Sequence, residues 1–228
     1  MKRYELHSHT DFSDGKSSIE EMINMAGEMN SAIAITDHFI GDEFPINKIL
    51  HPNMSSLDSF LNRREKFREK FKISDDVIFG IEITRINPKR IPEIAKAAKK
   101  LDFIVLVHGE TSSDKVPVGT NSAALNCEYV DVLAHPRHLS EENALKAKEN
   151  KIFIEITARE MHKSENPEIV RICKKFNLEM VIDTDAHSAG ELIDYRSAKK
   201  TGTDAGLSED EVRKTNENAK EIFKKYLI

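Results

Sequence analysis

Residues 4–15 read YELHSHTDFSDG and place two histidines, His7 and His9, at the end of a run with the composition of a β-strand. Successive side chains of a strand point to opposite faces, so side chains two residues apart point in the same direction. Two imidazoles directed at one point indicate a metal site, whereas an isolated His-x-His motif is more often a polar surface turn. The rest of the chain decides between these two interpretations.

Seven short, β-rich apolar runs alternate with helical patterns along the whole chain. The predicted strands are residues 3–7, 32–36, 77–84, 102–108, 130–135, 151–157 and 179–185. This alternation is typical of repeated βα units and a parallel sheet, so the predicted fold class is α/β. Because the 228 residues contain no low-complexity tract, composition break or linker, we expect a single domain.

Several helix starts can be read from the sequence. Ser18 and Ser208 each have a glutamate three residues later, which predicts a capping box. Pro92 and Pro167 stand where the first turn of a helix accepts proline. An apolar stripe at helical spacing covers residues 57–71, and the Arg and Lys residues within it are expected to form its solvated face.

The composition is that of a soluble globular protein, with 39% hydrophobic and 32% charged residues. No run approaches the ~18 consecutive apolar residues of a membrane span, and a first strand close to Met1 leaves no room for a signal peptide. Cys127 and Cys173 fall in predicted helices, which indicates reduced thiols and a cytoplasmic protein. The formal charge of −5 disfavours a broad nucleic-acid-binding surface.

Six of the seven predicted strands end in a potential metal ligand. These residues are His7, His9, Asp37, His38, Glu82, His108, His135, Asp185 and His187. A parallel barrel gathers the carboxyl ends of its strands on one face, where barrel enzymes carry their active sites. Histidine, aspartate and glutamate suit zinc, manganese or iron. The sequence therefore predicts a metal centre at that face.

Strand parity provides a second line of evidence. Leu133 stands two residues before His135, and an apolar side chain at that position fits a barrel interior. Glu5 stands two residues before His7, and two interpretations of it remain open. It either fixes the tautomer of the His7 ring by a hydrogen bond or lies in water near the start of the strand.

The sixth predicted strand ends without such a ligand, but the same parity directs Arg159 at the site. The planar guanidinium matches two phosphoryl oxygens, which indicates phosphate recognition. The alternative is that Arg159 pairs with Glu155 or a nearby loop. Residues 39–56 and 109–120 form loops longer than a βα unit requires, and we expect them to act as lids.

Six motifs follow one another in order over nearly the whole chain: HSHTDFSDG, ITDH, GIEIT, VHG, AHP and TDAH. Together they resemble the PHP (polymerase and histidinol phosphatase) family. The resemblance implies that residues 1–228 form one metal-dependent phosphoesterase domain, a distorted TIM-like (β/α)7 barrel. It also implies up to three metal ions at the carboxyl ends of the strands.

The resemblance assigns ligands at the matching positions. The first ion would be held by His7, His9, Glu82 and Asp185. Glu82 would bridge to a second ion, which would also bind His108 and His135. The third ion would bind Asp14, His38 and His187, with Asp11 as an alternative to Asp14. The expected cofactors are therefore two to three divalent ions of zinc, manganese or iron.

The implied activity is hydrolysis of a small phosphorylated substrate, as in histidinol phosphatase. Two metal ions bridged by a carboxylate can lower the pKa of a shared water and generate hydroxide. Glu82 and Arg159 would then act in catalysis, Arg159 by stabilising the phosphoryl oxygens. His138 or His162 could protonate the leaving oxygen, although a surface histidine is the more common explanation for each.

Three other classes of protein share parts of this pattern. TatD-like and amidohydrolase barrels share the first ligands but leave Asp14, His38 and His187 without a role. A PHP-type nuclease or phosphodiesterase would use the same metals on nucleic-acid ends, but the short single domain and acidic charge favour a small monoester. A non-catalytic RNA-binding subunit would be expected to lose metal ligands, and none of the nine ligands that the resemblance assigns is missing. The leaving group and the oligomeric state stay open.

Overall fold

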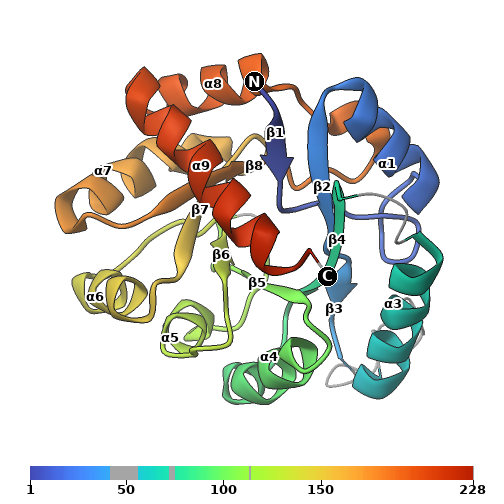
Figure 1. The fold of residues 1–228 in the computed structure, drawn as a ribbon. Helices are drawn as coiled ribbons and strands as arrows, with labels where there is room; N and C mark the ends of the chain where they lie inside the picture. The colour runs from blue at the N-terminus through green and yellow to red at the C-terminus, as the bar shows by residue number, and fades with distance from the viewer. Residues whose placement is uncertain (42–55, 72–74, 113, 228) are drawn as a thin grey trace.

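A computed structural model describes residues 1–41, 56–71, 75–112 and 114–227. Parallel strands form a nearly closed barrel inside a ring of helices, in the order β1-β2-β4-β5-β6-β7-β8 (Figure 1). The bounds are β1 Arg3–Glu5, β2 Ser31–Ile35, β4 Val77–Ile83, β5 Ile104–His108, β6 Val132–Ala134, β7 Phe153–Thr157 and β8 Met180–Asp183. A parallel bridge between Ser8 and Ala186 links the two ends of this order. The predicted single-domain, distorted TIM-like (β/α)7 barrel is confirmed.

A short additional strand, β3 (His38–Phe39), was not predicted from the sequence. It pairs with β4 beyond the end of β2, and its register places His38 opposite Glu82. Thr36 and Asp37 separate β2 from β3 in the chain. This extra pairing therefore brings a histidine and a carboxylate together at the carboxyl end of the barrel.

The helices start largely where the sequence predicts. Their bounds are α1 Ile19–Glu28, α3 Leu57–Phe71, α4 Ile91–Lys99, α5 Thr120–Leu125, α6 Glu141–Asn150, α7 Asn166–Phe176, α8 Tyr195–Asp204 and α9 Glu209–Lys225, with short 3-10 turns at Pro88–Arg90, Lys163–Glu165 and Ala189–Glu191. The capping boxes at Ser18 and Ser208 both form, and Pro92 and Pro167 lie in first turns. Within the described ranges, no helix has the length and hydropathy needed to cross a bilayer.

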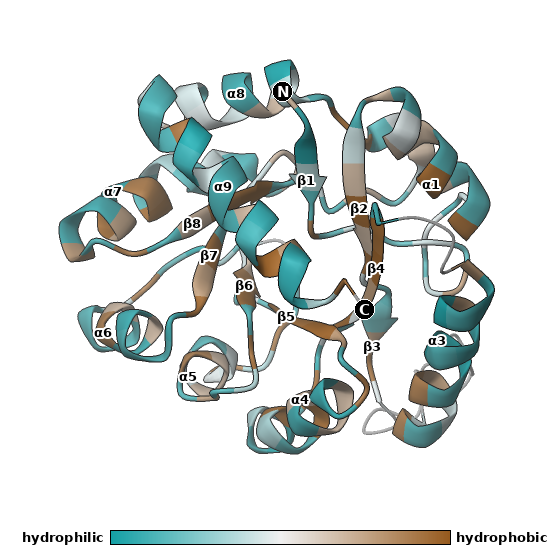
Figure 2. Ribbon diagram, in the orientation of Figure 1, coloured by the Kyte–Doolittle hydropathy of each residue, from teal (hydrophilic) through white to brown (hydrophobic). Residues whose placement is uncertain are grey.

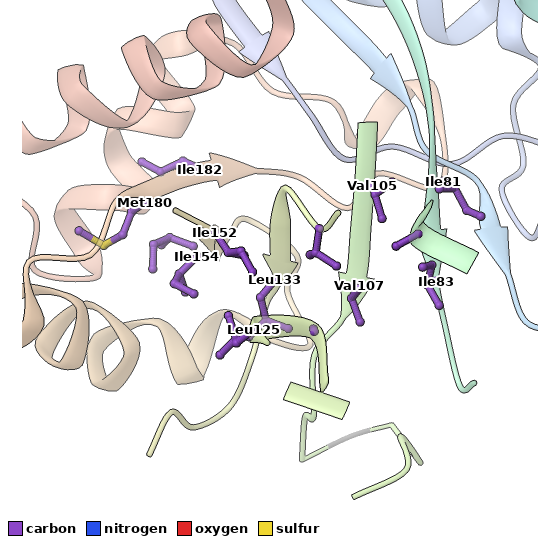
Figure 3. Close-up of a cluster of buried hydrophobic side chains, with 14 of the residues drawn as sticks. Ile81, Ile83, Val105, Val107, Leu125, Leu133, Ile152, Ile154, Met180 and Ile182 are labelled. Carbon is purple, nitrogen blue, oxygen red and sulfur yellow. The ribbon is translucent and has the colours of Figure 1, made fainter. Parts of the chain in front are cut away.

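The main hydrophobic core lies between the barrel and the helices around it (Figure 3). Figure 2 shows the matching pattern, with mostly apolar strands inside, except for the hydrophilic β1 and β3, and polar helix surfaces outside. Leu133 belongs to this outer core beside Leu125, so the prediction that it faces the barrel interior is wrong. The backbone at His135 has a φ of 29°, and this left-handed turn, rather than strand alternation, directs the ring inward.

A second, smaller core fills the amino-terminal end of the barrel. Its members from the strands include Ala32, Ile78 and Ile104. Ile222 and Phe223 of α9 pack against them and are fully buried. In Figure 1, α9 lies across this end of the barrel. The barrel is therefore closed by apolar side chains at one end.

One cationic side chain of α3 departs from the predicted solvated face. Arg64 is fully buried, and its Nη1 lies 2.6 Å from Oδ2 of Asp37. Its Nη2 donates to the carbonyl oxygen of Ile35 at 2.5 Å. The other carboxylate oxygen of Asp37 accepts a hydrogen bond from the backbone N–H of Thr10. Arg64 thus joins α3 to the segment that carries His7 and His9.

The two cysteines are free and buried. Cys173 lies in α7 as predicted, whereas Cys127 lies just beyond the end of α5. The predicted lid at residues 39–56 falls almost entirely outside the described residues. The second predicted lid is described except for residue 113, and it brings Asp114 to the carboxyl end of the barrel.

Candidate metal centre

The strand ends bring the predicted ligands into four overlapping groups at the carboxyl end of the barrel. Within each group the potential ligand atoms lie within 4.8 Å of one another. The groups are His7, His9 and Asp185; His9, Asp14, His38 and His187; His108, His135 and His162; and His7, His135 and Glu155. Residues from all parts of the sequence meet here because the strands are parallel and end at one face.

Glu82 lies at the centre of these groups and is fully buried. Its Oε2 lies 2.5 Å from Nδ1 of His38, 3.4 Å from Nε2 of His7 and 3.6 Å from Nε2 of His9. Its Oε1 lies 3.8 Å from Nε2 of His135. The two oxygens of one carboxylate therefore face different histidines, as a bridging ligand requires.

Asp14 reaches the group that the sequence assigned to a third ion. Its Oδ1 lies 3.3 Å from Nε2 of His187 and 3.5 Å from Nε2 of His38. The Asp14 side chain is 42% exposed, whereas His38 and His187 are largely buried. The structure thus brings Asp14, and not the alternative Asp11, to these two histidines.

The carboxylate that contacts the His7 ring is Glu155, which sequence reasoning considered only as a partner of Arg159. Its Oε2 lies 2.7 Å from Nδ1 of His7, and both side chains are fully buried. Glu5 contacts the backbone N–H of His7 and the side chain of Thr184 instead of the ring. Both interpretations of Glu5 are therefore wrong, because its carboxylate does not contact the ring and, instead of lying in water, is fully buried and paired with Arg3. Strand parity placed Glu155 on the same face as Arg159 but did not identify His7 as its partner.

Arg159 lies beside the centre, in contact with Asp185. Its Nε lies 3.2 Å from Oδ2 of Asp185, and its Nη1 donates to the carbonyl oxygen of the same residue at 2.7 Å. Nη1 also lies 2.9 Å from Nδ1 of His187 and 3.5 Å from Oε2 of Glu191. The alternative pairing of Arg159 with Glu155 is wrong, whereas a pairing with a nearby loop does occur, through Glu191.

A cavity of about 240 Å³ opens above the ligands. Its wall contains Arg159 and two residues that the sequence reasoning missed, Arg85 and Asp114. Asp114 lies 3.2 Å from Nη2 of Arg85 and 3.4 Å from Nε2 of His162. Arg85 has a φ of 54°, an unfavourable value for a non-glycine residue that is often found at functional sites. No sequence motif marks either residue, because their proximity depends on the path of two loops.

The two histidines considered as proton donors lie in different places. His162 is buried and lines the cavity above the ligands. His138 is exposed and lines a separate pocket with Arg137 and Glu168. The catalytic role of His138 stays a prediction, and its position does not favour it.

Burial and neighbouring charges set the protonation of these groups. Burial lowers the pKa values of His9 and His135 well below the ordinary value, which leaves both rings neutral. Burial also lowers the pKa of His7, but Glu155 and Glu82 outweigh it and raise that pKa well above the ordinary value. Burial raises the pKa of Glu82, but the surrounding histidines hold it well below its usual range. His9, His135 and Glu82 are thus in the forms that bind metals, whereas His7 would release its proton on binding a metal.

Unpaired buried atoms of the candidate ligands, as well as their residue types, indicate a site for divalent metal ions. Both ring nitrogens of His135 and Oε1 of Glu82 are buried and make no hydrogen bond within the described part of the chain. Buried polar atoms without partners are rare and costly in folded proteins. A bound cation would satisfy both residues, and imidazole and carboxylate are ligands for zinc, manganese and iron.

Comparison with protein families gives a match to the PHP domain over residues 5–228. The chain belongs to the PHP domain family. An uncharacterized protein of Methanocaldococcus jannaschii is 40% identical over 218 residues, which cover 93% of this chain and 94% of that protein. A protein of Caldicellulosiruptor bescii named as a probable phosphatase is 28% identical and covers 82% of this chain and 81% of its own length. Membership of this family, with the clustered ligands, assigns the chain to the metal-dependent phosphoesterases.

Two solved structures share the fold over nearly the whole chain. A chain in archaeal ribonuclease P with mature tRNA has a TM-score of 0.64 at 18% identity, covering 96% of this chain and 90% of that one. Histidinol phosphate phosphatase from Lactococcus lactis, complexed with zinc, L-histidinol and phosphate, has a TM-score of 0.60 at 15% identity, covering 91% and 95%. At sequence identities of 18% and 15%, the similarity concerns the fold alone.

Proposed function

We propose that this chain is a metal-dependent phosphatase that hydrolyses small phosphomonoesters. The observation that carries the proposal is the position of Glu82, whose two oxygens face separate sets of histidines beneath a cavity that Arg159 borders. The probable phosphatase of C. bescii and the L. lactis enzyme that binds L-histidinol and phosphate support the same reaction class.

The proposed ligands divide among two to three ions of zinc, manganese or iron. The first would bind His7, His9, Glu82 and Asp185, the second Glu82, His108 and His135, and the third Asp14, His38 and His187. When bound, such ions supply a water of lowered pKa and neutralise charge on a phosphoryl group. Glu155 would hold the His7 ring in one tautomer through Nδ1, which leaves Nε2 as the ligand atom.

Arg159 would bind the phosphoryl group from the side of the cavity. Within the described part of the chain its contacts use Nε and Nη1, so Nη2 remains to donate to a phosphoryl oxygen. The contacts with Asp185 hold the guanidinium in place before substrate arrives, which reduces the entropy lost on binding. A planar donor of this kind stabilises the charge that develops during phosphoryl transfer.

A small substrate fits both the cavity and the charge of the protein. The cavity of about 240 Å³ is close to the lower limit of pockets for small molecules, which is ~300 Å³. The net charge of −5 provides little attraction for a polyanion. The chain in ribonuclease P supports the alternative, a protein that acts on or binds nucleic acid.

A substrate panel tests the proposal directly. The purified chain would be supplied with zinc, manganese or iron and assayed on phosphomonoesters, a phosphodiester and single-stranded DNA, with Glu82→Gln as the control for contaminating phosphatases. We expect kcat/KM to be highest for a phosphomonoester. Faster release of nucleotides from DNA ends than of phosphate from any monoester would establish a nuclease instead. Tight RNA binding without hydrolysis of any ester would indicate a binding subunit.

A further inference from the structure

His162 is a buried histidine that belongs to none of the six sequence motifs. It follows β7 and immediately precedes the short turn Lys163–Glu165. Its backbone N–H donates to the carbonyl oxygen of Arg159 at 3.1 Å, which folds the segment back over the strand ends. Only 3% of His162 is exposed, while its neighbour Met161 is 50% exposed. The local turn therefore inserts this one imidazole into the wall of the cavity.

The inserted ring joins two of the proposed ligands. Potential ligand atoms of His108, His135 and His162 lie within 4.8 Å of one another. The rings of His135 and His162 are stacked, with centroids 4.5 Å apart and an angle of 7° between planes. The ring of His108 lies nearly perpendicular to that of His135, at 86° and 4.5 Å. Three imidazoles from three different strand ends thus surround one small space.

Two independent observations indicate that this space holds a ligand. Both ring nitrogens of His135 are buried without a hydrogen-bonding partner among the described residues, and its backbone is held at a φ of 29°. Buried donors and acceptors are rarely left unpaired, and strained backbone of this kind is concentrated at functional sites. In addition, Oδ2 of Asp114 lies 3.4 Å from Nε2 of His162 and 3.8 Å from Nε2 of His108. A carboxylate beside the cluster favours a cation within it.

We propose that His162 is a further metal ligand, which makes the second metal site a three-imidazole site formed with His108 and His135. The inference rests on the proposed function, because it assigns an additional residue to the same metal centre. A nitrogen-rich site of this kind selects zinc or iron over magnesium or calcium, which prefer oxygen ligands. Asp114, contributed by the loop after β5, would balance the charge of the bound ion and orient the His162 ring.

Zinc binding to the metal-free chain of residues 1–228 tests this assignment without any substrate. Zinc would be titrated against a chromophoric chelator, and bound metal would be counted by elemental analysis for the wild type, His162→Ala and His162→Gln. His138→Ala is the matched control, because His138 is exposed and lines another pocket. His162→Gln keeps most of the side-chain volume, so it preserves the test if His162→Ala fails to fold. Circular dichroism checks folding in each case.

We expect both His162 variants to weaken one zinc site by at least ~10-fold or to lose one equivalent of zinc, while His138→Ala binds as the wild type does. Zinc number and affinity within about twofold of the wild type in a folded His162 variant would overturn the proposal. If that variant also turned over more slowly, His162 would be a proton donor instead of a ligand. Zinc binding as expected, without hydrolysis of any phosphate ester, would refute the proposed function alone.

Discussion

Both ends of the barrel contain fully buried side chains, but the two sets have opposite chemistry. At the amino-terminal end, Phe223 and Ile222 of α9 cover apolar side chains of the strands, and neither is exposed. At the carboxyl end, His7, Glu82 and Glu155 have the same lack of exposure, but they are ionisable. Apolar burial stabilises the fold directly, whereas buried ionisable groups cost free energy unless they bind partners. Substitutions at the two ends should therefore separate stability from activity.

The largest effect on activity is expected for Glu82, at the centre of the carboxyl end of the barrel. Glu82→Ala should lower kcat/KM for phosphomonoesters on the order of 10⁴-fold or more, equivalent to ~5.5 kcal/mol of transition-state stabilisation. Two metal ions should be weakened together, because Oε2 of Glu82 faces His7 and His9 while Oε1 faces His135. Steady-state kinetics and elemental analysis of the same preparation would measure both changes.

Asp14→Ala is the matched control for that variant. Its side chain is partly exposed and lies near only the group of His38 and His187. We expect it to weaken one ion and to leave measurable turnover. Identical metal loss in the two variants would refute the division of ligands among three ions.

At the amino-terminal end of the barrel, we expect a loss of stability without a loss of activity. Phe223→Ala should lower the free energy of unfolding by ~3–5 kcal/mol, because it removes a fully buried ring and leaves a cavity. The folded fraction should keep its kcat, since α9 covers the end of the barrel remote from the ligands. Urea unfolding would measure the loss of stability, and kinetics normalised to the concentration of folded protein would measure kcat. Val118→Ala, whose side chain is 91% exposed, should change neither quantity. A large loss of kcat in folded Phe223→Ala would show that the two ends are coupled.

A smaller effect on activity alone is expected for Arg159→Lys. Lysine keeps the charge but cannot contact Asp185 and a phosphoryl group with a planar fork. Catalytic efficiency should fall by roughly tenfold or more, which corresponds to at least ~1.4 kcal/mol. Metal content and melting temperature should stay near wild type. A variant that melts much earlier but turns over normally when folded would assign Arg159 to the fold.

The smallest effect concerns the start of α9. The Ser208 side chain accepts a hydrogen bond from the backbone N–H of Glu211 and completes a capping box. Ser208→Ala should reduce the free energy of unfolding by ~1 kcal/mol without changing kcat or KM. Chemical denaturation would show this as a lower midpoint with an unchanged slope. An unchanged midpoint would mean that α9 is held by its apolar contacts alone.

The sequence was informative where a residue's role follows from local periodicity. Parallel strands end at one face, so ligands at the ends of strands could be grouped before their distances were known. The same reasoning identified the capping boxes at Ser18 and Ser208, because a cap depends on residues three apart. The position of each ligand at the end of its strand and each cap are local in the sequence, and the fold keeps them unchanged.

Features that depend on contacts between distant segments were missed. Arg64 has the spacing of a solvated side chain, but Asp37, which lies 27 residues earlier, draws it into the interior. Leu133 and His135 point to different faces because the backbone turns at His135, and alternation cannot anticipate a positive φ. The contact between Glu155 and His7 joins residues 148 positions apart. In each case a distant partner or a backbone turn, and not the residue type, determines the position of the side chain.

Metal stoichiometry tests most directly whether the carboxyl end of the barrel is a metal centre. The chain would be stripped of metal, reconstituted with zinc, manganese or iron, and subjected to elemental analysis alongside a thermal melt. The ligand groups around Glu82 predict more than two ions per chain and a melting temperature that rises with metal concentration, because the ions bind the folded state. Saturation at two ions would remove the site of Asp14, His38 and His187. Less than one ion per chain, with no change in melting temperature, would contradict the assignment of this end of the barrel as a metal centre.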